Sequence, residues 1–174
     1  PSLQDLVRSD VREDRQGTPL QLTINVVSVA SGCAPVANVA VEIWQCDANG
    51  RYRHPRDRGG PEEDANFQGF GHTVTDAEGR YRFRTIRPVP YPGRTPHIHA
   101  AMFQEADRPF VTQIYVAGEP LNARDGLFMR VPEALRPLLL ADFVAVDDPV
   151  AELAAEFDFV LAPVLAGLFE VHAA

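Results

Sequence analysis

The sequence predicts an all-β protein: an antiparallel Greek-key β-sandwich of the immunoglobulin or prealbumin kind, with long loops and little helix. Three observations predict it. Short segments that alternate apolar and polar residues recur along the 174 residues, turns rich in Gly, Pro and Asn separate them, and helical periodicity is scarce.

The first predicted strands lie in the first third of the chain. Residues 20–30 alternate apolar and polar side chains, as a strand with one buried face does. Residues 31–38 form a turn, and 39–46 resume a β-branched and aromatic strand. Charges, Gly and Pro then dominate 47–70, which predicts a long exposed loop of the kind that carries function.

A hairpin is predicted next, between strands 71–75 and 80–86. The second strand alternates arginines with Tyr81, Phe83 and Thr85, so one of its faces should be wet and the other buried. Further elements are predicted towards the C-terminus: strands at 97–103, 111–117 and 156–162, and a short helix near 132–140 that Pro137 interrupts.

One heptapeptide occurs twice, as 47-DANGRYR-53 and 76-DAEGRYR-82. Two copies are too few for a repeat architecture, so the same turn chemistry is predicted in both places. Tyr81 continues into an alternating strand beside Phe83, which indicates core packing. Tyr52 leads into a polar, irregular loop, where a packing role is harder to defend.

Composition excludes several classes of function. The net charge of −8 argues against nucleic acid and anionic membranes, which need clustered basic residues. No apolar run approaches the ~20 residues that span a bilayer. We expect one domain over 1–174, with 1–19 as an N-terminal arm. The chain begins at Pro1, which is compatible with a removed leader, so cytoplasmic and exported locations both stay open.

The sequence contains two cysteines, Cys33 and Cys46. They flank one predicted strand, and a disulfide requires Cα atoms within about 7 Å, so local geometry favours two ordinary thiols. Their spacing fits no zinc site.

The stretch 88-PVPYPGRTPHIHAAMF-103 carries the candidate site. In a strand, residues i and i+2 share a face, so His97 and His99 lie about 6.5 to 7 Å apart along the chain and can converge on one ion. Such a pair is often just two partly exposed histidines. The metal interpretation gains from Tyr91 and Arg94 in the adjoining bend, and from Tyr52 on the long loop.

The sequence here resembles the intradiol ring-cleavage dioxygenases, non-haem Fe(III) enzymes that include protocatechuate 3,4-dioxygenases and catechol 1,2-dioxygenases. The resemblance is carried by residues 41–55, 66–99 and 111–115, which together cover most of 20–117. All four ligand positions recur in order.

The resemblance implies that Tyr52 and Tyr91 are tyrosinate ligands, and His97 and His99 imidazole ligands, of one non-haem Fe(III) ion per chain. The chemistry is consistent, because a phenol with a pKa near 10 loses its proton at neutral pH only to a strongly polarising ion. Hard anionic oxygens also favour Fe(III), whereas zinc more often recruits Cys, His or carboxylate.

The resemblance further implies the reaction. A catechol-type ring would be cleaved by O2 between its two hydroxylated carbons, to give a cis,cis-muconate-type dicarboxylic acid. Tyr91 would leave the ion when substrate binds, Arg94 would stabilise developing negative charge, and Gln113 would line the pocket. Gly93 stands where protocatechuate enzymes often have a bulky aromatic residue, which predicts a wider pocket on that side.

Two alternatives stay open on the sequence. One is a non-catalytic transthyretin-like or immunoglobulin-like binding module, which the same strands would serve. The other keeps the metal but makes it a zinc or copper Lewis acid. The particular catechol and a homo-oligomeric state are also left open. The cysteine pair resembles that of small exported members of the family.

Overall fold

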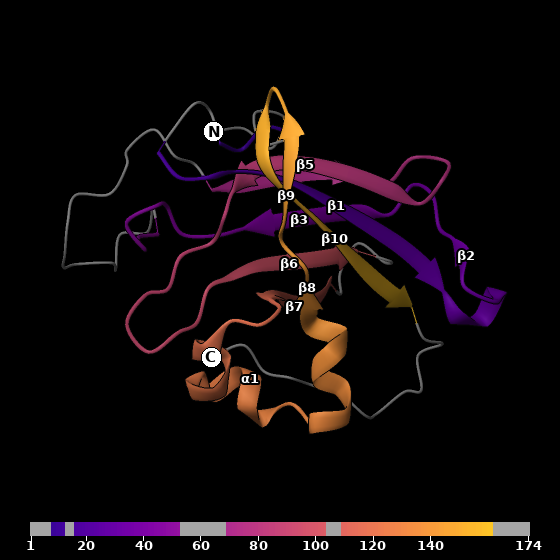
Figure 1. The fold of residues 1–174 in the computed structure, drawn as a ribbon. Helices are drawn as coiled ribbons and strands as arrows, with labels where there is room; N and C mark the ends of the chain where they lie inside the picture. Colours follow the sequence, from indigo (N-terminus) through magenta and orange to yellow (C-terminus); the bar gives the residue numbers. More distant parts are fainter. Residues whose placement is uncertain (1–7, 13–15, 53–68, 104–108, 162–174) are drawn as a thin grey trace.

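The computed structural model describes residues 8–12, 16–52, 69–103 and 109–161. Strands form two five-stranded sheets, and the helical segments are short, which confirms the predicted mostly-β class (Figure 1). The Greek-key order of connections stays a prediction. Most of the predicted loop 47–70 falls on residues 53–68, which lie outside the described ranges.

The first sheet has the order β2-β1-β10-β9, with β5 also paired to β1. Strands β1 and β10 run parallel, with Leu20 opposite Leu153 and Ser28 opposite Leu161, so the fully antiparallel prediction was wrong. Side chains alternate along a strand in parallel and antiparallel sheets alike, so the sequence pattern does not reveal the direction of the neighbouring strand. The strands span Pro19–Ser28 (β1), Ala34–Pro35 (β2), Arg80–Ile86 (β5), Val144–Asp148 (β9) and Ala151–Leu161 (β10).

The second sheet has the order β4-β3-β6-β7-β8, and its β7–β8 pair is also parallel. The predicted hairpin of 71–75 with 80–86 was wrong, because β4 pairs with β3 in this sheet while β5 pairs with β1 in the other. The turn between them therefore carries the chain from one sheet to the next. The strands span Ala40–Trp44 (β3), Phe70–Val74 (β4), His97–Phe103 (β6), Pro109–Val116 (β7) and Leu140–Ala141 (β8).

The helical segments are Val29–Ser31 (η2), Pro120–Arg124 (η3), Gly126–Arg130 (α1) and Glu133–Leu139 (η4). The predicted helix near 132–140 is η4, a 3₁₀-helix that contains Pro137. The sequence did not predict η3 and α1. Within the described ranges, none of these segments has the length and apolar character that crossing a bilayer requires.

One apolar core lies between the two sheets. It is built from alternate residues of the strands, such as Leu22 and Ile24 of β1 and Ile98, Ala100 and Met102 of β6. Because side chains alternate along a strand, the intervening residues of β6 point away from this core. The outer face of the second sheet is thereby open to polar side chains.

The repeated heptapeptide forms the same turn twice, as predicted. The Asp47 carboxylate accepts the backbone N–H of Asn49 and of Arg51. In the same way, the Asp76 carboxylate accepts the backbone N–H of Glu78 and of Arg80. The glycine in each turn has a positive φ, 74° at Gly50 and 69° at Gly79.

Both cysteines are free thiols, as local geometry predicted: Cys33 is exposed and Cys46 is buried. Burial raises the pKa of the Cys46 thiol to about 11, which keeps it protonated and unreactive at neutral pH.

A comparison of Gly79 with Gly32, two glycines of similar positive φ, gives a stability prediction. Gly79→Ala should lower the free energy of unfolding by more than about 2 kcal/mol, because a left-handed L-residue costs about 1–2 kcal/mol and the added Cβ would lie 2.7 Å from the Val26 carbonyl oxygen. Gly32 has a similar φ of 68° and open space, so Gly32→Ala should show only the backbone cost. Equal losses in urea denaturation would contradict the steric argument.

Candidate metal centre

The candidate site lies on the outer face of the second sheet, where β3, β6 and β7 run side by side. The register places Trp44 opposite His99 and His99 opposite Gln113, while His97 lies opposite Tyr115. These five side chains therefore form two adjacent rows on one face. Strand pairing alone brings together residues separated by more than seventy positions in the sequence.

The two histidines converge as the strand spacing predicts, with their Nε2 atoms 3.2 Å apart. His97 Nδ1 lies 2.7 Å from the carbonyl oxygen of Thr95, which assigns the proton to Nδ1 and leaves Nε2 a lone pair. The His99 ring stacks on Trp44, with centroids 4.8 Å apart and planes at 5°. Both rings are thus held in fixed orientations.

Both imidazoles are neutral at neutral pH. Burial lowers the pKa of His97 to about 4, although the hydrogen bond from Nδ1 to Thr95 opposes the shift. Burial, with the neighbouring His97, lowers the pKa of His99 to about 3. A neutral imidazole is the form that binds a metal ion.

Tyr91 reaches the histidines from the bend that precedes β6. Its backbone carbonyl accepts the N–H of Arg94, and Gly93 within this turn has a φ of 81°. Tyr91 Oη lies 3.4 Å from His97 Nε2. Burial raises the pKa of Tyr91, while the nearby guanidinium of Arg94 lowers it in part.

Tyr52 joins the site from the loop after β3. Its ring meets the Tyr91 ring edge-on, with centroids 5.6 Å apart, and lies 6.2 Å from the His99 ring. The two tyrosine side chains are close enough for each to shift the pKa of the other. Burial, with the neighbouring Tyr91, raises the pKa of Tyr52 above its usual value. The loop fits closely, since a Cβ at Gly50 would lie 3.1 Å from the Pro90 carbonyl oxygen.

Arg94 lies beside this cluster and contacts three groups. Its Nη1 donates to Tyr91 Oη at 3.1 Å, its Nη2 donates to Gln113 Oε1, and its Nε donates to Asp125 Oδ2 at 2.9 Å. Gln113 also accepts the Tyr115 hydroxyl at 2.6 Å. The predicted Gln113 therefore lies in the site, coupled to Arg94.

Gly93 is exposed, and a Cβ built on it would meet nothing within 4 Å. The wider pocket on this side stays a prediction. The positive φ gives a second reason for glycine here, one that the sequence did not reveal.

Sequence reasoning missed two functional contacts: the stacking of Trp44 on His99 and the ion pair of Asp125 with Arg94. Asp125 precedes Gly126–Arg130 as an N-cap, and that signature was readable. Its pairing with Arg94 was not, because the two residues lie 31 positions apart.

The donor set fits a metal ion. Two nitrogen ligands bound at about 2.1 Å with a right-angle geometry lie about 3 Å apart, close to the observed Nε2 separation. Across the described ranges, His, Cys, Asp and Glu side chains form no group of three or more that could hold a metal. Tyr91 and Tyr52 lie beside the two histidines, and a set of phenol oxygens and imidazole nitrogens would suit a hard, highly charged ion better than zinc.

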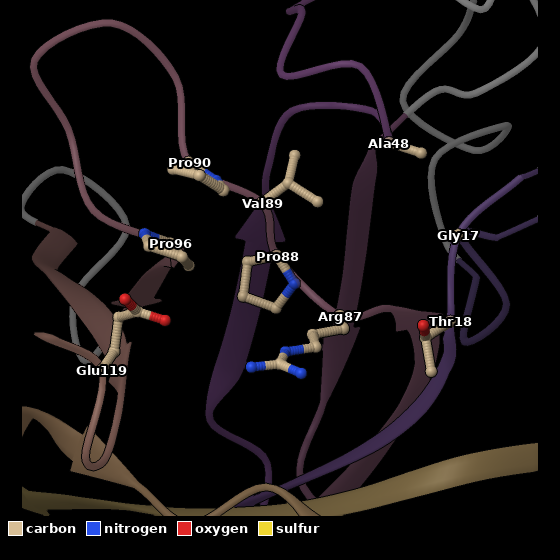
Figure 2. Close-up of a pocket in the computed structure, with 9 residues that line it drawn as sticks. All are labelled: Gly17, Thr18, Ala48, Arg87, Pro88, Val89, Pro90, Pro96 and Glu119. Atoms are coloured by element: carbon tan, nitrogen blue, oxygen red, sulfur yellow. The ribbon is translucent and has the colours of Figure 1, made fainter. Parts of the chain in front are cut away.

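A separate cavity of about 350 Å³ lies beside the bend that carries Tyr91 and Arg94 (Figure 2). Pro90 and Pro96 border it at the two ends of that bend, and Arg87 and Glu119 supply its charged side chains. None of the four candidate ligands lines it. The cavity is therefore distinct from the histidine and tyrosine cluster.

Comparison with known proteins identifies the class. A family described as dioxygenase matches residues 1–163. The protocatechuate 3,4-dioxygenase beta chain of Burkholderia cepacia is 41% identical over 172 residues, which cover 92% of this chain and 72% of that one. The solved intradiol ring-cleavage dioxygenase of Tetranychus urticae superposes with a TM-score of 0.74 at 26% identity, covering 91% of this chain and 88% of that one.

The chain belongs to the intradiol ring-cleavage dioxygenase family, whose members open a catechol-type ring. The share of a relative's length that this chain matches differs between members of the family. The hydroxyquinol 1,2-dioxygenase of Rhodococcus opacus is 30% identical over 154 residues, and the matched region covers 78% of this chain but only 47% of that enzyme.

The stacked pair gives a direct test of metal binding. Trp44 is the single tryptophan of the sequence, so loading the metal-free protein with iron should strongly quench its emission as the ion binds the stacked imidazole. His99→Ala should abolish the quench. His72→Ala is the matched control, since His72 pairs with Glu42 at 3.0 Å on the same sheet. Equal quenching in the His99→Ala protein would contradict the assignment.

Proposed function

We propose that Tyr52, Tyr91, His97 and His99 bind one Fe(III) ion and that the chain cleaves a catechol with O2. The observation that carries this proposal is the convergence of Tyr91 Oη and His99 Nε2 on His97 Nε2, at 3.4 and 3.2 Å. The Tyr52 ring lies against the rings of both Tyr91 and His99. The donors come from three separate segments that the fold brings to one face.

The charges of the donor set support a trivalent ion. The imidazoles contribute no charge, because burial keeps both neutral. Burial also disfavours free phenolates at Tyr52 and Tyr91, so their ionisation would depend on the ion itself. Two phenolates and one hydroxide would neutralise three positive charges, which lowers the cost of burying the centre.

Bound there, Fe(III) would withdraw electron density from a coordinated catechol and expose its ring carbon to O2. Tyr91 is the residue proposed to accept a substrate proton, at Oη, because Arg94 Nη1 already donates to that atom and would stabilise it while it is negative. Arg94 also remains positive throughout, so it can stabilise negative charge that develops on the substrate.

The reaction balances without a further reductant. A catechol and one O2 contain together the atoms of the muconic acid product, because both oxygen atoms enter the two new carboxyl groups. Cleavage falls between the two hydroxylated carbons, where the substrate oxygens are held. The open side at Gly93 is proposed to accept a ring substituent. Oxygen uptake with catechol, protocatechuate, hydroxyquinol and chlorinated catechols would identify the preferred ring.

Metal analysis and colour distinguish the iron centre from the two alternatives, a zinc or copper centre and a non-catalytic module. Two tyrosinates on Fe(III) give a visible red-brown charge-transfer band, whereas a zinc centre or a non-catalytic module is colourless. Near-stoichiometric zinc or copper in active protein would replace the iron proposal. Family membership already argues against the non-catalytic module.

Tyr52→Phe should lower bound iron and remove much of the visible absorbance per iron, because one anionic donor is lost. Tyr81→Phe is the matched control, since Tyr81 occupies the same place in the second heptapeptide but packs on Phe83 at 4.9 Å between centroids. Full colour and activity in the Tyr52→Phe protein would show that Tyr52 is not a ligand.

Arg94→Ala should retain iron but lower kcat/KM about 10²- to 10³-fold, the range seen when one charge-stabilising donor is removed. The Tm should also fall, because Asp125 loses its ion-pair partner while buried. Iron content, Tm and steady-state kinetics check the three expectations. Loss of iron with unchanged turnover per iron would instead give Arg94 a structural role.

A further inference from the structure

We propose that Asp125 is a positioning residue that fixes Arg94 and, through Thr95, His97 in their working orientations; this rests on the proposed function. Asp125 lies outside the stretches that carry the family resemblance, and no contact with the ion is assigned to it. Its carboxylate is fully buried, while the side chain of Arg94 is 16% exposed.

The two oxygens of Asp125 divide their contacts. Oδ1 accepts the backbone N–H of Leu127 and of Phe128, at 2.9 and 3.1 Å, and thereby caps α1. Oδ2 accepts Arg94 Nε and the backbone N–H of Thr95, both at 2.9 Å. Capping needs only Oδ1, so the contacts of Oδ2 serve the site.

The bond to Nε determines where the rest of the guanidinium points. A guanidinium is planar and its donors form a rigid fork, so fixing the Nε edge directs Nη1 and Nη2 elsewhere. They meet Tyr91 Oη and Gln113 Oε1. Without Asp125, the same positive charge would be free to rotate away from Tyr91.

The bond to Thr95 extends the effect to a ligand. The Thr95 N–H donates to Asp125 Oδ2 and its carbonyl oxygen faces His97 Nδ1, so one peptide segment links the carboxylate to the imidazole. The Thr95 hydroxyl donates to Asn122 Oδ1 at 2.8 Å, and Asn122 Nδ2 donates to the Val116 carbonyl at 2.9 Å. The bend is therefore attached to the segment of η3 and α1 at several points.

The state of the carboxylate agrees with this role. Burial would raise the pKa of Asp125, but the N–H groups of Thr95 and Phe128 and the guanidinium of Arg94 outweigh it, and the pKa is lowered. Asp125 therefore remains an anion that can hold Arg94 across the neutral range.

Two substitutions separate positioning from capping. Asparagine caps a helix about as well as aspartate, so Asp125→Asn should keep α1 while removing the charge that holds Arg94. Asp125→Ala removes both contacts and serves to measure the capping contribution. Glu119→Gln is the matched control, since it removes a carboxylate that caps the neighbouring η3 through Leu121 N–H.

Steady-state kinetics on the iron-loaded enzyme, with catechol as the probe, give the first test. Asp125→Asn should lower kcat/KM about 10- to 100-fold, the loss expected for a hydrogen bond to a charged group. In an Arg94→Ala background the same change should lower kcat/KM clearly less than in the unsubstituted enzyme, because the contact with Arg94 is gone and only the contact with Thr95 remains. Glu119→Gln should stay within about twofold of the unsubstituted enzyme.

Thermal unfolding of the metal-free proteins gives a second test that needs no activity. Arg94→Ala leaves Asp125 buried and unpaired, so adding Asp125→Asn to it should raise the Tm. A residue that only caps α1 would leave that Tm unchanged or lower it.

The outcomes are distinguishable. An unsubstituted protein that lacks both iron and catechol cleavage would overturn the proposed function. If that protein is active, equal losses of kcat/KM in both Arg94 backgrounds, or no loss with Asp125→Asn, would overturn the inference about Asp125. A double variant that melts no higher than Arg94→Ala would also count against the ion pair.

Discussion

The alternation of side chains along β6 is the constraint on which the site depends. Ile98, Ala100 and Met102 enter the core between the sheets, so His97 and His99 must lie on the opposite face. A shift of one residue in the pairing of β6 would bury both imidazoles among apolar groups and expose three core residues. The hydrophobic effect on one face of the strand therefore fixes the positions of two ligands on the other.

Electrostatics then explain how a site of this kind persists before it meets an ion. The imidazoles are neutral, burial favours protonated tyrosines, and Arg94 is paired with the buried carboxylate of Asp125. Unpaired buried charge is thus avoided among these residues, which keeps the cost of assembling the cluster low. An ion of high charge would convert the same groups into anionic ligands.

The sequence contained much of this arrangement, because the relevant signals are local. Strand periodicity located the core strands, and the i, i+2 spacing predicted that His97 and His99 share a face. The partners of each strand were not predictable in the same way. Alternation fits either sheet and either direction, so the parallel β1–β10 pair and the separation of β4 from β5 appear only in the fold. The Arg94–Asp125 pair was hidden for the same reason, since it depends on where α1 packs.

The two copies of the heptapeptide show how one local structure acquires different roles. Each begins with an aspartate that accepts two backbone N–H groups and contains a glycine with positive φ, so the turns themselves are alike. The second turn leads directly into β5, which pairs with β1, and Tyr81 there packs on Phe83. The first turn instead packs against the bend at Pro90 and Tyr91, and this places Tyr52 beside His99. The tyrosine's chemistry is therefore set by what its turn packs against, and substitutions in the bend should affect Tyr52 as much as substitutions in its own loop.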